Sequence, residues 1–285
     1  MHDSFKAFDY WTNAHNAPYH FPMTLEQWYA SMYEDVDSDG RKLFDKLTFR
    51  YYRRPGTPVD HVDGMAVYGT TAFGFADSGE ISLDVHYKVI RDLSFDPQTP
   101  EVGQDLLAHA LEDLGEDGCI YAYFHYFGLS GYARHGKLHE SQGHIHDLLL
   151  KNGFTIEHEN VYYHRELLGL DVEDGRITIG WKEMNSGNCR EFAASTDGQE
   201  FGWGQVHFLP QGHIAYLRWI YIDEKRQHQG LGSAAMATLC AQLHQMGITR
   251  FDTDTAVQNT AAQGYYEKTG FSNRGITRSY YKKKD

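Results

Sequence analysis

The sequence WIYIDEKRQHQGLGSAAM, residues 219–236, decides the fold of the second half of the chain. Its first four residues are typical of a buried strand. From Leu231 to Met246 apolar residues recur four apart, as on the buried face of a helix, and Gly247 follows where a helix end favours glycine. The glycines of the loop Gln227–Gly232 let the backbone approach a ligand closely. Because the N–H groups of a helix's first turn point toward such a loop, we expect it to hold a phosphate group.

A second motif, NTAAQGYYEKTGF, occupies residues 259–271 and predicts a helix over residues 260–268. Together the two motifs resemble the GNAT acyltransferase superfamily. The signature of that superfamily is a strand, a Q/R-x-x-G-x-G/A loop, a helix and a later N-x-x-A-x-x-x-Y-x-K-x-G-F helix. The resemblance covers roughly residues 170–285, and it is specific because the two motifs agree in content, order and separation.

The resemblance implies an enzyme, a GNAT-type N-acetyltransferase with acetyl-CoA as co-substrate and no metal. The pyrophosphate is expected on the backbone amides of residues 228–233, and the pantetheine arm beside residues 220–222. The residues expected to bind acetyl-CoA are Ile220, Tyr221, Ile222, Gln227, His228, Gln229, Gly230, Leu231, Gly232, Ser233, Asn259 and Tyr266.

Attack of an amine on a thioester defines what the catalytic residues must do. A backbone N–H must meet the developing oxyanion, and Ile222, at the end of its strand, is the candidate. Tyr266 is the candidate donor of a proton to the departing thiolate, although its ring could instead pack on one face of its helix. Asn259 is expected to face the thioester, and it could equally cap the helix that follows it.

A general base for the amine is not evident from the sequence. The candidates lie on or near strands that would border an acceptor groove, and each is more typical of a surface residue. They are Glu183, Glu191, His213 and Asp223.

The first half shows a similar order of expected elements, with strands before a helix, a strand and a second helix. We therefore expect an α+β fold of two tandem GNAT-like domains, residues 1–165 and 166–285. Each would have a mixed, mostly antiparallel sheet flanked by helices. An unrelated α+β domain in the first half is the alternative.

Two alignments relate the halves. Matching the strand end at Ile222 to Phe95 aligns Gly230 with Gly103, and it sets an aspartate where the second half has Gly232. A carboxylate there would repel a pyrophosphate, so the first domain is predicted to be degenerate and not to bind CoA. The later motif aligns Tyr266 with Leu149 at a smaller spacing, so roughly ten extra residues are expected in the first half.

Charge separates the halves. Residues 1–165 hold 13 basic and 25 acidic residues, whereas residues 166–285 hold 13 and 14. An acidic chain argues against nucleic acid as a partner and favours an acceptor amine, in a small molecule or a peptide, that is cationic. The start of the chain lacks the pattern of an export signal, and its apolar stretches are too short to span a membrane. We therefore expect a cytoplasmic monomer or homodimer.

Seventeen histidines raise the question of a metal site. His135 and His139 stand four apart, with His144 and His146 close by. Glycines interrupt any helix that would align them, and no H-E-x-x-H frame is present, so a polar surface loop is expected.

The leading hypothesis is direct transfer of an acetyl group to a primary amine in a ternary complex. One alternative is an acyl-CoA-binding regulatory or assembly module without turnover. The other is transfer of a different acyl group, or transfer to an alcohol.

Overall fold

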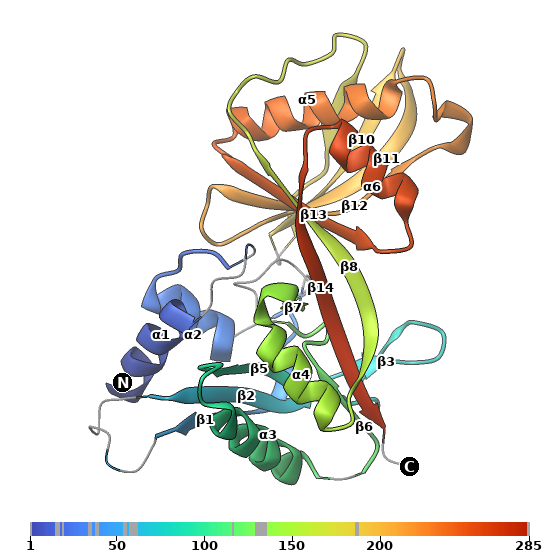
Figure 1. The fold of residues 1–285 in the computed structure, drawn as a ribbon. Coiled ribbons are helices and arrows are strands. Elements are labelled where there is room, and N and C mark those ends of the chain that lie inside the picture. The colour runs from blue at the N-terminus through green and yellow to red at the C-terminus, as the bar shows by residue number, and fades with distance from the viewer. Residues whose placement is uncertain are drawn as a thin grey trace. The chain divides into compact units, whose positions relative to one another are not determined.

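The computed structural model describes residues 2–14, 18, 20–33, 36–37, 40–53, 56, 62–115, 117–128, 136–185 and 188–283. Contacts divide the chain into two units, and Figure 1 labels most of their helices and strands. Unit 1 contains Met1–Asp37, Arg41–Glu159 and Thr277–Asp285, and unit 2 contains Ser38–Gly40 and Asn160–Ile276. None of the described helices is long and apolar enough to cross a membrane.

Unit 2 contains a sheet in the order β8-β13-β12-β11-β10-β9. Among its described pairs, β12 and β13 are parallel and the others are antiparallel. Its helices α5 and α6 pack on one face of the sheet, where their apolar residues join the strands in one core. The elements are β9 (Thr178–Trp181), β10 (Cys189–Thr196), β11 (Gln199–Phe208), β12 (Ile214–Ile222), the 3-10 helix η2 (Glu224–Arg226), α5 (Leu231–Gln245), β13 (Arg250–Ala256) and α6 (Thr260–Lys268).

The predicted helices of unit 2 are confirmed. The four apolar residues spaced along α5 are all buried, and Gly247 has a φ of +88°, the left-handed conformation that favours glycine at a helix end. The residues of α6 are those expected from the second motif. The expected α+β fold is therefore present, with the helix, strand, helix and strand in the predicted order.

Unit 1 contains a sheet in the order β1-β2-β5-β6-β14, in which β5 and β6 are parallel. The helices α3 and α4 contribute to its main core. The elements are α1 (His2–Ala14), α2 (Leu25–Tyr33), β1 (Phe44–Tyr52), β2 (Gly64–Thr71), β3 (Gly74–Phe75), β4 (Ile81–Ser82), β5 (Lys88–Phe95), α3 (Pro100–Leu114), β6 (Cys119–Ala122), β7 (Leu138–His139), the 3-10 helix η1 (Glu140–Gln142) and α4 (Gly143–Lys151).

Unit 1 departs from the sequence expectations at several elements. The apolar run over residues 119–127 predicts a buried strand, but β6 ends at Ala122 because Tyr123 takes a left-handed φ of +53° and turns the chain. The sequence also predicts a helix over residues 147–151, whereas α4 begins at Gly143, and it predicts no helix where α1 forms. Residues 128–143, for which the sequence predicts a looser segment, lie partly outside the described residues.

The later parts of the two halves repeat at a constant spacing of 117 residues. Helix α4 and strand β8 (Thr155–Glu166) match α6 and β14 (Ser272–Lys283) end for end. The turns between them also match, because Phe154 N–H donates to Leu149 O as Phe271 N–H donates to Tyr266 O. The alignment of Tyr266 with Leu149 is therefore confirmed.

The alignment that matches Ile222 to Phe95 is confirmed only in part. Strands β5 and β12 agree at the expected spacing, and each has a bulge at an arginine, Arg91 and Arg218. The following loop has four residues in unit 1, 96–99, and eight in unit 2, 223–230, so the match of Gly230 to Gly103 is wrong. Gly103 lies inside α3, where an added Cβ would fall 2.4 Å from the Phe95 ring. That glycine serves helix-to-strand packing.

Strands β8 and β14 are each shared between the two units. Residues Asn160–Glu166 of β8 pair with β13 in unit 2, although β8 begins in unit 1. Residues Tyr280–Lys283 of β14 pair with β6 in unit 1, although β14 begins in unit 2. The sequence division at residues 165 and 166 therefore differs from the division by contacts, because each repeat donates its last strand to the other unit.

Two polar side chains cap the start of α2. The spacing of Thr24 and Gln27 predicts a reciprocal capping pair. The structure confirms it, because Gln27 N–H donates to Thr24 Oγ1 (3.2 Å) and Thr24 N–H donates to Gln27 Oε1 (3.0 Å). We expect Thr24→Ala to lower the free energy of unfolding of unit 1 by about 1 kcal/mol. Urea unfolding measures this, and Thr24→Ser should keep most of the stability. Equal losses in both variants would contradict a capping role.

Candidate functional site

Strands β12 and β13 separate halfway along β12. Their parallel pairing joins residues 214–217 to residues 250–253, and among the described residues it extends no further. Asp223 N–H donates to Phe201 O of β11 (2.8 Å). Because successive N–H groups of a strand point to opposite sides, those of Ile220 and Ile222 point away from β11, into the gap beside β13. An extended ligand could accept hydrogen bonds from these N–H groups in the gap.

The loop after β12 is held by its own side chains. Gln227 Nε2 donates to Ile222 O (2.9 Å), and Gln229 Nε2 donates to Lys225 O (2.8 Å). His228 and Gly230 have left-handed φ angles of +59° and +77°. Alternation of this kind turns successive N–H groups to one side and forms a concave anion site. The side chains of Gln227 and Gln229 therefore shape the loop, and its backbone faces outward.

The first turn of α5 adds to this anion site. Gly230 is its N-cap without a side-chain hydrogen bond, and the turn contains no acidic residue. The first N–H groups of a helix lack intrahelical partners, and the helix dipole makes this end positive. Gly232 and Ser233 are half-exposed here, whereas the Leu231 side chain is buried and contributes only its backbone.

Gly232 leaves limited room beside the loop. An added Cβ would lie 3.4 Å from the Tyr265 ring and 3.6 Å from Ile222 Cγ1, which is ordinary contact. Tyr265 Oη donates to Gly232 O (2.9 Å) and so fixes the first turn of α5 to α6. A methyl group is therefore tolerated at residue 232, and a longer side chain must enter the space before the loop.

Tyr266 occupies a buried position in α6, with 5% of its surface exposed. Burial raises the pKa of its phenol, a hydrogen bond with the Thr253 side chain lowers it, and the charge of Asp254 raises it again. Thr253 and Asp254 lie on β13 where that strand leaves β12, so the phenol lies at the gap. The ring also packs in the core, so the packing interpretation of Tyr266 is confirmed, and its role as a proton donor stays a prediction.

Asn259 and Tyr221 have roles in the fold. Asn259 Oδ1 accepts a hydrogen bond from Ala262 N–H (3.1 Å), so its expected capping of α6 is confirmed. The Tyr221 ring stacks on Trp203, and its N–H points toward β11 by the alternation described above. The backbone of Tyr221 is therefore turned away from the gap.

The four candidate bases are surface residues or have other partners. Glu191 pairs with Lys182 (2.6 Å), and Asp223 accepts from Lys225 N–H (2.9 Å) at the start of η2. Glu183 and His213 are exposed. None of the four is connected to Tyr266 by the contacts of the described residues.

Asp254 was missed in the sequence. This half-buried carboxylate accepts hydrogen bonds from Tyr216 Oη (2.6 Å) and Asn160 Nδ2 (2.7 Å). Its neighbour Asp252 is fully buried and is bonded by Arg250 and His164 instead. Asp252 therefore pairs with the Arg250 guanidinium and the His164 ring, whereas Asp254 is held by Tyr216 and Asn160 at the gap, close enough to affect Tyr266.

The equivalent gap in unit 1 is closed by a tyrosine. Tyr123 Oη donates to Leu93 O (2.8 Å) and accepts from Leu93 N–H (3.1 Å). Leu93 matches Ile220 at the spacing of 127, so the phenol takes the backbone groups that are open in unit 2. Helix α3 also begins with Pro100, which has no N–H, and Glu101 stands in its first turn. An anion is disfavoured at that helix start.

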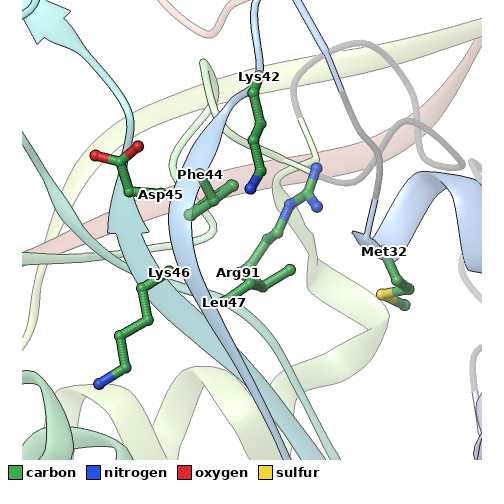
Figure 2. Close-up of a pocket in the computed structure, with 7 residues that line it drawn as sticks. All are labelled: Met32, Lys42, Phe44, Asp45, Lys46, Leu47 and Arg91. Carbon is green, nitrogen blue, oxygen red and sulfur yellow. The ribbon is translucent and has the colours of Figure 1, made fainter.

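A pocket of about 330 Å³ lies in unit 1 (Figure 2), lined by Met32, Lys42, Phe44, Asp45, Lys46, Leu47 and Arg91. Arg91 is buried and donates to the backbone carbonyls of Ser31, Phe127 and Gly128. Its guanidinium therefore ties α2 and the segment after β6 to β5. The pocket contains none of the residues that the sequence motifs single out.

The described histidines that suggested a metal have partners within the fold. His139 Nδ1 is hydrogen-bonded to Ser141 Oγ, His144 Nε2 to Phe95 O, and His146 Nδ1 to Tyr280 Oη. His135 lies outside the described residues. Among those described, no group of three potential ligands converges on a metal position.

Comparison with known proteins places the motifs in a family. Residues 156–271 match the acetyltransferase (GNAT) family. The [ribosomal protein bS18]-alanine N-acetyltransferase of Escherichia coli strain K12 is 36% identical over 62 residues, which are 22% of this chain and 42% of that protein. The same enzyme of Shigella flexneri matches equally. The chain thus spans less than half the length of these curated relatives.

Solved structures extend the likeness to nearly the whole chain. A tandem GNAT protein from the clavulanic acid biosynthesis pathway has a TM-score of 0.59 and 11% identity, over 98% of this chain and 94% of that one. A GCN5-related glucosamine N-acetyltransferase region in a fungal multi-domain GH3 β-N-acetylglucosaminidase has a TM-score of 0.62 and 11% identity, over 98% and 37%. At these identities the likeness concerns the fold, which is that of a tandem GNAT protein.

Proposed function

We propose that this chain, which belongs to the GNAT acetyltransferase superfamily through residues 156–271, transfers an acetyl group from acetyl-CoA to a primary amine in unit 2. The observation that carries the proposal is the anion site at the start of α5, directly beside the gap between β12 and β13. The anion site suits a pyrophosphate, and the gap suits an extended arm with amide groups. No other described helix start combines the two.

The binding residues follow from this arrangement. The amides of residues 228–233 hold the pyrophosphate, and the outward backbone groups of Ile220 and Ile222 pair with the pantetheine arm. Asn259, the N-cap of α6, is proposed to face the thioester. Bound acetyl-CoA supplies the activated acetyl group, and the chain supplies position, charge stabilisation and proton transfer.

Each reacting atom has a residue assigned to it. The amine nitrogen forms a bond to the thioester carbonyl carbon, the Ile222 N–H stabilises the negative oxygen, and the carbon–sulfur bond then breaks. Tyr266 donates its phenolic proton to the departing sulfur. Asp254 accepts the proton that the amine loses, and its position near Tyr266 lets the two groups act on opposite sides of the transferred acetyl group.

Unit 1 is proposed to bind no CoA. Its gap is filled by Tyr123, its loop is shorter, and its helix start carries a glutamate. We infer that it serves as scaffold for unit 2. The expected number of acetyl-CoA molecules bound to each chain is therefore one.

Isothermal titration with acetyl-CoA tests this proposal. Gly232→Asp puts a carboxylate against the pyrophosphate, and like charges in contact cost several kcal/mol, so we expect affinity to fall by more than about 100-fold. An acidic residue in the first turn of a helix favours folding, so thermal stability should not fall. Gly232→Ala is the matched control, because the site has room for a methyl group, and it should bind nearly as wild type.

The possible outcomes separate the hypotheses. Two equivalents bound to wild type would contradict the closed gap of unit 1, and no binding would overturn the acetyltransferase proposal. Binding of one equivalent with no turnover on any amine of a broad panel would favour an acyl-CoA-binding module. Competition with succinyl-CoA would reveal a different acyl donor.

A further inference from the structure

The face of β11 and β12 that lies opposite α5 and α6 carries three large aromatic side chains. Trp203 and Tyr221 are cross-strand neighbours whose rings stack with centroids 5.9 Å apart and an interplanar angle of 20°. Tyr221 is 49% exposed and Trp219 is 43% exposed. Large aromatic groups gathered at the surface are typical of a recognition site.

This aromatic face is continuous with the proposed reaction site. The bulge at Arg218 shifts the alternation of β12, so Tyr216, Trp219 and Tyr221 all lie on the face away from the core, whereas Ile220 and Ile222 pack toward it. Tyr216 binds Asp254 on that same face. From the level of Asp254 to the stacked rings is three residues of strand, or roughly 10 Å.

The residues at both ends of this stretch, from Asp254 to the stacked rings, favour a positively charged ligand. A carboxylate, Asp254, stands at one end. At the other end the Trp203 indole N–H donates to Glu200 Oε2 (2.9 Å), so a second carboxylate lies beside the stack. The faces of tryptophan and tyrosine rings attract cations, and alkyl chains pack well on an aromatic surface between them.

Resting on the proposed acetyl transfer, we infer that the acceptor is an elongated polyamine. Its reacting ammonium group lies at Asp254, its alkyl chain crosses Trp219, and its second ammonium group is bound by the Trp203–Tyr221 pair with Glu200. In the reaction Asp254 takes one proton from the first ammonium group, whose nitrogen then attacks the thioester. The second proton that this nitrogen loses replaces the proton that Tyr266 gives to the departing sulfur. The second ammonium group keeps its protons and determines specificity.

The test measures binding without turnover. Protein saturated with CoA, which has no acetyl group to transfer, is titrated calorimetrically with spermidine and, separately, with butylamine, which has a single ammonium group. We expect wild type to bind spermidine more tightly. Trp203→Leu should weaken spermidine binding about threefold to thirtyfold, the range for cation–π contacts, with butylamine and CoA binding unchanged. Tyr126→Leu removes an exposed aromatic residue of unit 1 and should change the binding of neither amine.

The outcomes separate a failure of the acetyltransferase proposal from a failure of the polyamine inference. If CoA does not bind wild type, the acetyltransferase proposal fails and this inference fails with it. If CoA binds but spermidine and butylamine bind equally, or Trp203→Leu weakens both alike, only the polyamine inference is overturned. Selective loss of spermidine binding in Trp203→Leu alone would support it.

Discussion

Replacing Tyr266 with phenylalanine is expected to lower kcat about 100-fold to 10,000-fold, while the affinity for acetyl-CoA changes little. The substitution removes the phenolic proton that we assign to the departing sulfur, and it keeps the ring that packs in the core. Initial rates follow from the free CoA thiol released with saturating acetyl-CoA and an accepted amine. Because burial raises the pKa of the Tyr266 phenol, wild type should lose no activity through this group below pH 10.

Tyr163 provides the control for this substitution. Its ring lies 5.6 Å from that of Tyr266, and its hydroxyl donates to Glu267 Oε1 (3.3 Å), away from the gap. Tyr163→Phe should therefore keep most of the activity. A loss below tenfold in Tyr266→Phe, or equal losses in both variants, would reduce Tyr266 to a packing residue.

Asp254→Asn is expected to lower kcat/KM about 100-fold or more at neutral pH, because the amine then has no carboxylate to take its proton. The loss should shrink as the pH rises toward the amine's own pKa, about 10.4 for a lysine-like group, since the free amine then forms without help. The measurement is a pH profile of kcat/KM for wild type and variant. The direction of this pH effect is specific, because kcat/KM of the variant rises relative to that of wild type as the pH increases.

Glu191→Gln is the matched control, because Glu191 is a carboxylate of the same sheet that pairs with Lys182 at the surface. It should leave the profile unchanged. A loss in Asp254→Asn that is equal at every pH would contradict a role in proton transfer, and it would point to placement of the acceptor alone.

Elements with strong local signals could be predicted from the sequence. The apolar spacing of α5, its terminal glycine, and the capping pair of α2 all depend on residues within a few positions, and the structure confirms them. The loop before α5 could be found for the same reason. Strand β8 and helix α1 lacked such signals. Their positions depend on partners far along the chain, as in the pairing of β8 with β13.

The residues that sequence reasoning missed are those that tertiary structure brings together. Asp254 is an ordinary strand residue until Tyr216 and Asn160 meet it from neighbouring strands. The role of Tyr123 in filling the gap of unit 1 could not be predicted from local sequence, because its partner Leu93 is 30 residues away. The mistaken match of Gly230 to Gly103 shows the same limit, since spacing alone cannot reveal a loop shortened by four residues.

The sharing of β8 and β14 between the units has a consequence for biosynthesis. Residues 277–283 belong to the sheet of unit 1, so that sheet lacks a strand until β14 has left the ribosome. A chain emerging from its N-terminus usually folds one domain after another. Here the first unit must wait for the second, with the open edge of β6 exposed to solvent or to a chaperone meanwhile. Synthesis of the two repeats as separate polypeptides would leave each without the strand that the other carries.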